Sequence, residues 1–210
     1  MADGQDSISA EMGGRELTIG MEIREVRKAR GLTLKLVSDL TGVSVAHLSK
    51  IERGDTGISV ELLTKIGQAL KVDPRWFYPP RNGKGPLERS FIVRQRDRRP
   101  LSNLYSRPFE ELRFEDELLS SSLAWQFYLV LSRFPAGGDP PTSREMYAFE
   151  GEQHGLVLAG RIRLSLGEEV VELAAGDSFS FPSTVPHRIE NSGLEEAVVV
   201  WGMAPVRISW

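Results

Sequence analysis

One short stretch in the first third of the chain carries side chains that could read the edges of DNA bases. Lys50 and Arg53 can donate hydrogen bonds to guanine acceptors or to phosphates, and Ser49 can bond to either. Val45 and Ala46 are apolar and small enough to touch a thymine methyl group. If one helix places these five side chains on its exposed side, that side forms a surface for the major groove of double-stranded DNA.

The rest of the sequence shows no pattern typical of a catalytic site. It contains no G-x-S-x-G elbow, no P-loop and no G-x-G-x-x-G run after a strand. It also contains no cysteine, which excludes thiolate chemistry and disulfides and agrees with a cytoplasmic protein. No run of about 18 apolar residues is present, so we expect no membrane span. These features favour a binding protein, not an enzyme, and we predict no catalytic residue.

The net charge of -3 argues against a protein that coats nucleic acid in general, but it leaves room for a local DNA-binding face. Such a face needs helices to present it, and apolar residues do recur at helical spacing between residues 18 and 78. The punctuation of this segment suits helix caps. It predicts helix starts at Thr33, Ser44 and Ser59, helix ends at Gly31, Gly42 and Gly54, and a last turn that opens at Pro74.

Beyond residue 90 the apolar residues alternate, as in half-buried strands. The alternation is clear at 125–134, 161–166, 169–173 and 196–203, and glycines and prolines separate these runs. It places Ile162 and Leu164 on the face opposite Arg161 and Arg163. Several short strands of this kind predict an all-β sandwich or barrel. Residues 109–123 fit either a short helix or an extended arm, and both interpretations stay open.

The composition divides the chain into four parts. Residues 1–16 are polar and read as a flexible tail, and residues 17–78 form the helical domain. A linker follows at 79–99, starting with a run rich in proline and glycine, and the β domain occupies 100–210. Within the linker, residues 81–99 hold seven basic and two acidic side chains. The favoured interpretation of this basic stretch is a solvated connector.

The helical segment resembles the XRE family of bacterial and phage repressors over about residues 18–78. It carries Gly42-Val43-Ser44, Leu48-Ser49 and Ile51-Glu52-Arg53-Gly54, with Ser38 where the family usually has alanine. The resemblance implies a helix-turn-helix whose second helix enters the major groove. Glu52 is expected to stabilise the domain through a local ion pair. Thr33 fits a phosphate contact or a plain helix cap equally well. The predicted DNA-binding residues are Thr33, Ser44, Val45, Ala46, Ser49, Lys50 and Arg53.

The second half resembles the cupin superfamily. The resemblance rests on the run 176–182, GDSFSFP, followed by Val185-Pro186-His187 and Asn191. It implies a small double-stranded β-helix barrel with a cavity at its wide mouth. Counting back from the turn glycine Gly160 gives the metal-ligand positions of the first cupin motif. A metal-binding cupin has His, His and Glu at these positions, and this chain has Tyr147, Phe149 and Gln153.

Only His187 keeps the ligand type of a cupin metal site. One imidazole, one amide, one phenol and one phenyl ring do not supply the three or four donors that a transition metal needs. We therefore predict no metal and no cofactor. Tyr147 and Phe149 instead offer flat surfaces to a small organic effector, and Gln153 and His187 offer hydrogen bonds. The alternative, that these side chains simply fill the barrel, remains open.

The two resemblances together imply a two-domain architecture, an all-α helix-turn-helix bundle followed by an all-β cupin barrel. They further imply a cytoplasmic transcriptional regulator that binds a DNA operator as a homodimer and senses a small molecule with its β domain. The alternative is an enzyme of the hydroxypropylphosphonate epoxidase type, which shares this layout. That enzyme would need iron ligands at 149, 153 and 187, and two of these three residues are of the wrong type.

Overall fold

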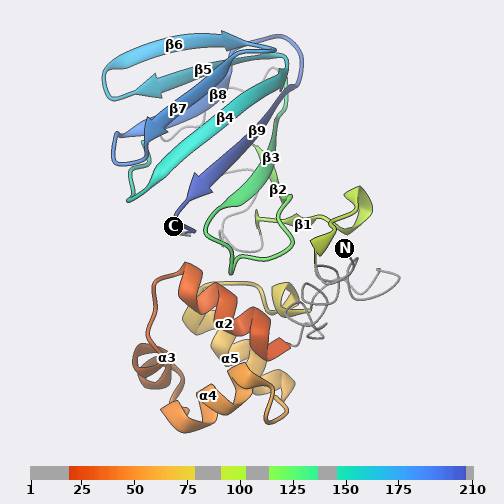
Figure 1. The fold of residues 1–210 in the computed structure, drawn as a ribbon, viewed down its shortest axis with the longest axis vertical. Coiled ribbons are helices and arrows are strands. Elements are labelled where there is room, and N and C mark those ends of the chain that lie inside the picture. Colours follow the sequence, from red (N-terminus) through yellow and green to blue (C-terminus); the bar gives the residue numbers. More distant parts are fainter. Residues whose placement is uncertain (1–18, 79–90, 103–113, 137–145, 207–210) are drawn as a thin grey trace, which may run out of the picture.

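The computed structural model describes residues 19–78, 91–102, 114–136 and 146–206. These residues form a helical part and a β-sheet part, which lie one above the other along the long axis of the molecule (Figure 1). The two parts correspond to the predicted all-α and all-β domains. None of the described helices is long and apolar enough to span a membrane.

The helices begin and end at the predicted caps. The hydroxyls of Thr33, Ser44 and Ser59 each accept a hydrogen bond from the backbone amide three residues further on. Gly42 and Gly54 end two helices with φ of 72° and 77°, a backbone region that glycine enters without strain. The helical elements are α2 (Ile19–Ala29), α3 (Leu34–Thr41), α4 (Val45–Arg53), α5 (Val60–Leu70) and the 3-10 helix η1 (Pro74–Phe77).

The β part consists of two antiparallel sheets. A six-stranded sheet has the order β1-β2-β3-β9-β4-β7, and a three-stranded sheet has the order β6-β5-β8. Their strands are β1 (Arg99–Pro100), β2 (Glu115–Leu118), β3 (Tyr128–Phe134), β4 (Glu152–Ala159), β5 (Arg161–Leu166), β6 (Glu169–Ala174), β7 (Ser178–Pro182), β8 (His187–Asn191) and β9 (Ala197–Ala204). A short 3-10 helix, η2 (Gln95–Asp97), precedes β1.

The alternation of apolar residues correctly predicts which side chains face the interior. Ile162 and Leu164 are buried in a cluster with Phe179 and residues of β4 and β9, whereas Arg161 and Arg163 on the same strand are exposed. The sequence left residues 109–123 open between a helix and an arm. Of these, 109–113 lie outside the described residues, and 115–118 form the strand β2.

The helical and β parts share one hydrophobic core. Trp76 and Phe77 from η1 belong to the same buried cluster as Leu123, Tyr128 and Met203 from the β part. Apolar side chains in this junction are removed from water on both sides, which stabilises the contact between the parts. The described parts therefore pack on each other directly, and the chain that connects them is not their only link.

Arg99 lies inside this junction. Its guanidinium donates a hydrogen bond of 2.7 Å to Glu22 of α2 and lies 4.2 Å from the centre of the Trp76 ring. Only 13% of the Arg99 side chain is exposed. The interpretation of the basic stretch 81–99 as a solvated connector is therefore wrong for Arg99, although Arg94 and Arg96 are exposed. The reason is tertiary, because α2 brings a buried carboxylate to this position.

A second carboxylate of α2 also faces the β part. Glu25 accepts hydrogen bonds from the Ser122 hydroxyl at 2.8 Å and from the Leu123 backbone amide at 3.0 Å. Both residues lie in the connection between β2 and β3. The pKa of Glu25 is raised from 4.5 to about 7, first by burial and then by the nearby charge of Glu22, against the hydrogen bonds that lower it. Glu25 therefore titrates near neutral pH in the folded protein.

Replacing Glu25 with glutamine should change how stability depends on pH. Because the pKa is about 7 in the folded state and 4.5 ordinarily, the folded protein holds this proton more tightly than the unfolded chain. The resulting stability is fully present below pH 4.5 and is lost as the pH rises through about 7. Urea unfolding at about pH 5 and about pH 8 should show a smaller fall in the free energy of unfolding for Glu25→Gln, by up to about 3 kcal/mol.

The matched control is Glu61→Gln, which makes the same change in an exposed carboxylate of α5. Its pH dependence should follow the wild type. A wild-type slope that Glu25→Gln leaves unaltered would contradict the buried, proton-binding state of Glu25.

Candidate nucleic-acid interface and β-domain site

Helix α4 presents the predicted reading residues on its exposed side. Val45, Ala46, Lys50 and Arg53 are exposed, and Ser49 is half-buried. The opposite side of α4 carries Leu48, Ile51 and Glu52, which are buried. The side chains predicted from the sequence for base readout therefore share one accessible face of one helix.

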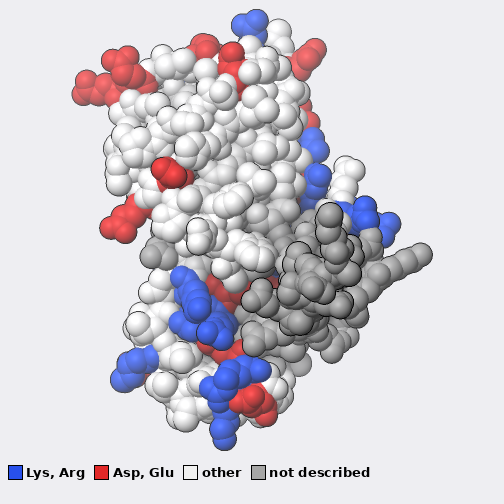
Figure 2. Space-filling model, viewed as in Figure 1, with Lys and Arg blue, Asp and Glu red and all other residues white. Residues whose placement is uncertain are grey.

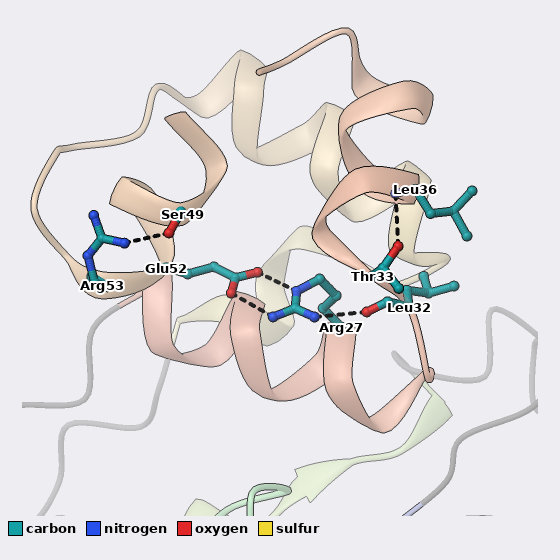
Figure 3. A network of polar contacts seen from close by, with 7 residues as sticks. All are labelled: Arg27, Leu32, Thr33, Leu36, Ser49, Glu52 and Arg53. Atoms are coloured by element: carbon teal, nitrogen blue, oxygen red, sulfur yellow. Dashed lines mark hydrogen bonds and ion pairs between the residues drawn. The ribbon is translucent and has the colours of Figure 1, made fainter. Parts of the chain in front are cut away.

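Arg53 is already engaged along this face. Its guanidinium donates to the hydroxyl of Ser49, one turn earlier (Figure 3). Its Nε lies 2.7 Å from Oδ2 of Asp55. About half of each ion-pair partner is exposed, so the pair contributes little to stability. Its effect is to orient the guanidinium. A bidentate contact from Arg53 to a guanine would have to replace at least one of these bonds.

Two contacts fix α4 against α2. Arg27 donates to both carboxylate oxygens of Glu52, at 2.6 and 2.9 Å, and also to the carbonyl of Leu32 at 2.8 Å (Figure 3). The prediction of a local ion pair for Glu52 is thus confirmed. Near the N-terminus of α2, a Cβ on Gly20 would lie 1.9 Å from the carbonyl oxygen of Ile51, so only glycine permits this close approach. These two contacts fix the position of α4 relative to α2.

Thr33 and Ser44 lie at the N-termini of α3 and α4. Thr33 accepts from the Leu36 amide at 3.1 Å, and Ser44 accepts from the His47 amide at 3.2 Å (Figure 3 for Thr33). Each is therefore a helix cap. Both residues are exposed, and capping uses the oxygen only as an acceptor, so each hydroxyl proton can still be donated to a phosphate.

In the β part, Gln153 of β4 and His187 of β8 meet inside the barrel. The Gln153 amide nitrogen lies 2.7 Å from Nε2 of His187, and Nδ1 of His187 lies 2.8 Å from the carbonyl oxygen of Val185. A carbonyl can only accept, so the proton of the ring is on Nδ1, and Nε2 accepts from Gln153. Burial lowers the pKa of His187, which favours this neutral form.

Aromatic rings surround the imidazole. The Phe149 ring lies edge-on at 5.5 Å between centroids, and the Phe181 ring lies at 4.9 Å. Tyr147 reaches His187 through its backbone, with two hydrogen bonds of 2.9 Å between their amides and carbonyls. The structure thus brings all four predicted ligand-binding residues together around His187. Tyr147 and Phe149 are half-buried, and Gln153 and His187 are buried.

These residues do not fit a metal ion. The Nε2 lone pair that a metal would take is occupied by the Gln153 amide, and the neighbouring ring of Phe149 has no donor atom. Within the described ranges, no three His, Asp or Glu side chains are grouped to hold a metal. The site can offer hydrogen bonds and aromatic surface, but no metal chemistry.

Ser183, which the sequence motifs do not single out, lies next to this site. Its residue is fully buried, and its hydroxyl makes no hydrogen bond to a described residue. Its amide and carbonyl bond to Gly151 and to Phe149, so it continues the inward alternation of Phe179 and Phe181. This alternation could have identified Ser183 from the sequence as an inward-facing residue. Deeper in the barrel, Phe179 occupies the space above Gly155, where a Cβ would lie 2.2 Å from the ring.

Comparison with known proteins agrees with both parts. Residues 23–77 match the helix-turn-helix family HTH_3, and residues 130–203 match the cupin domain family Cupin_2. The HTH-type transcriptional regulator PuuR of Escherichia coli (strain K12) is 23% identical over 181 residues, which cover 86% of this chain and 91% of that protein.

Two solved structures show likeness along most of the chain. An HTH_3 family transcriptional regulator from Vibrio cholerae is 24% identical with a TM-score of 0.40, covering 89% of this chain and 94% of that one. Hydroxypropylphosphonic acid epoxidase from S. wedmorenis is 15% identical with a TM-score of 0.44, covering 91% and 98%.

The fold and both family matches identify the chain as a helix-turn-helix protein of the XRE type with a C-terminal cupin domain. Its full-length relative PuuR is a transcriptional regulator, and the chain is a DNA-binding transcriptional regulator of this two-domain class.

Elemental analysis of the purified protein should find no stoichiometric zinc, iron or manganese, because His187 is the only side chain among the four that is a usual metal ligand. One tightly held transition metal per chain that His187→Ala releases would contradict this prediction. It would also favour the enzyme interpretation.

Proposed function

We propose that the protein binds a specific DNA operator as a homodimer and that its β domain senses a small organic molecule. The observation that carries the DNA-binding part is the exposed face of α4, formed by Val45, Ala46, Ser49, Lys50 and Arg53. Helix α4 lies at the end of the molecule away from the β part, where nothing described covers it (Figure 1). In the view of Figure 2, basic side chains lie over the helical part, together with some acidic ones, and most charged side chains at the far end of the β part are acidic.

The sensing part rests on the chemistry around His187. Gln153, Ser183 and two aromatic rings offer polar and flat contacts, with no charged side chain among them. The buried hydroxyl of Ser183 makes no hydrogen bond to a described residue, and a buried polar atom in that state is costly, so a bound molecule could stabilise it. The site suits a neutral molecule with a hydrogen-bonding group and an apolar or planar body.

The proposed dimer interface is the outer face of the six-stranded sheet. Leu129, Leu156 and Leu158 point outward there, with exposures of 36%, 41% and 49%, next to the half-buried Val198 and Val200. Figure 2 shows this side, where β4 and β9 lie in front, as largely uncharged. An uncharged apolar face suits a second copy of itself. A two-fold axis along the long axis of the molecule would place both α4 helices at the same end, as a palindromic operator requires.

The enzyme alternative lacks support from the site. It requires metal ligands at positions 149, 153 and 187, and Phe149 has no donor atom while the His187 lone pair is used by Gln153. The proposed function therefore assigns the β domain to binding and not to catalysis.

Selection from a random duplex library should recover a palindrome whose half-sites lie about one helical turn, roughly 10 base pairs, apart. Against that duplex, Lys50→Ala or Arg53→Ala should weaken binding by about 1–3 kcal/mol for a side chain that makes a bidentate base contact. The loss for Arg53 is reduced by the bonds to Ser49 and Asp55 that it must exchange.

The matched control is Arg163→Ala, because Arg163 also forms an exposed ion pair, with Glu172 at 3.0 Å, but lies on β5. Its affinity should equal that of the wild type. Unchanged affinity in both α4 variants would show that another surface reads the operator, and failure to select any duplex would refute the DNA-binding proposal.

Native mass spectrometry of protein purified without denaturation should detect a bound small organic molecule. Ser183→Ala and Gln153→Ala should lower its occupancy, since each removes a hydrogen-bonding group from the site. Ser180→Ala is the control, because Ser180 lies on β7, which ends just before Ser183, but faces outward, where it contacts His154. A molecule retained equally by all three variants would place the sensing site elsewhere.

A further inference from the structure

The β-domain site and the reading helix are linked through the interior by named contacts. Gln153, Met203 and Tyr128 are register partners on β4, β9 and β3, so they form one row across the six-stranded sheet. Gln153 holds His187 at one end of this row, and the Tyr128 hydroxyl lies 3.3 Å from the sulfur of Met203. The row ends where β3 begins, next to the connection between β2 and β3.

That connection, residues 119–127, contacts α2 at Glu25. It is fixed to β3 by two hydrogen bonds of 2.9 Å: the Leu119 amide donates to the Leu129 carbonyl, and the Leu129 amide donates to the Ser120 hydroxyl. The Ser122 hydroxyl accepts from the Ala124 amide at 2.9 Å and donates to Glu25. Any shift of β3 therefore moves the two donors that hold the Glu25 carboxylate.

On its other side, α2 is fixed to α4. The Arg27–Glu52 ion pair and the contact of Gly20 with the Ile51 carbonyl leave no room for the two helices to slide independently. A displacement of α2 at Glu25 thus carries α4 with it. The helical part would turn as a unit relative to the β part.

We propose that α2 transmits the state of the β-domain site to the reading helix α4, with Glu25 as the positioning residue that receives the signal. This proposal rests on the sensing function proposed above and specifies its regulation. In a dimer held by its β domains, a turn of the helical part changes the separation of the two α4 helices. Operator affinity then depends on whether the site is filled, and the coupling acts equally in both directions.

The buried carboxylate of Glu25 suits the transmission of a signal because the loss of any one of its hydrogen bonds is costly. Both oxygens of Glu25 are engaged, by a hydroxyl and by a backbone amide, in a junction that also contains Glu22 and Arg99. Loss of either donor leaves a buried acceptor unpaired, which is costly and favours two discrete arrangements over a gradual shift. Glutamine at this position can satisfy only one of the two donors with an acceptor.

Hydrogen exchange with mass spectrometry on the full-length protein tests the route without DNA and without a known ligand. The site is perturbed by His187→Ala, and by His187→Gln as a second variant in case the first disrupts folding. We expect exchange in the peptide that covers α2 to become about three-fold faster or more. Relative to Glu25→Gln alone, adding either His187 change should produce no further acceleration. Glu61→Gln, an exposed carboxylate of α5, is the control and should leave the response intact.

Two results would overturn the proposal. One is an α2 peptide that does not respond to either His187 variant, and the other is a response of equal size with and without Glu25→Gln. The selected duplex gives a second readout, in which the effect of His187→Gln on affinity should shrink when Glu25→Gln is present. If no duplex is selected, DNA binding as proposed fails, and the exchange result still decides the route.

Discussion

The arrangement of the two domains depends on how the charges of α2 are buried against the β part. Arg99 offers its guanidinium to Glu22 while stacking on Trp76, and Glu25 takes two hydrogen bonds from the connection at Ser122 and Leu123. Two buried carboxylates so close together need such partners, because an uncompensated buried charge is strongly destabilising. These contacts fix the orientation of the helical part, and the shared hydrophobic core around Trp76 packs beside them.

Helix α2 contacts both the β part and α4, so the position of the exposed face of α4 depends on how α2 packs. One side of α2 contacts the β part, and another is tied to α4 through Arg27 and Gly20. The β site is organised in a comparable way. Both ring nitrogens of His187 are engaged in hydrogen bonds, so the polar, aromatic interior of this cupin domain does not fit a metal ion. The residues around His187 and the exposed face of α4 are thus joined by packed, hydrogen-bonded elements.

The sequence by itself determined the local features of this protein. Caps such as Ser44 and Gly54 are chosen by backbone hydrogen bonding within a few residues, so their positions can be read directly. The alternation around Ile162 likewise follows from strand geometry and one buried face. The exposed side of α4 was predictable for the same reason, since helical periodicity fixes which residues oppose Leu48 and Ile51. The residues grouped around His187 came from motif spacing, and the fold does bring them together.

Only the tertiary structure decided which polar groups meet across long stretches of sequence. Arg99 belongs to a basic stretch that favours solvent, yet it is buried because α2 presents Glu22 at that position. Glu25 and Leu123 lie 98 residues apart, and no local pattern encodes their contact. The tautomer of His187 is also an outcome of packing, as is the burial of the Ser183 hydroxyl without a hydrogen bond to any described residue. Local propensity acts over a few bonds, whereas desolvation and hydrogen-bond satisfaction are set by whichever groups the completed fold brings together.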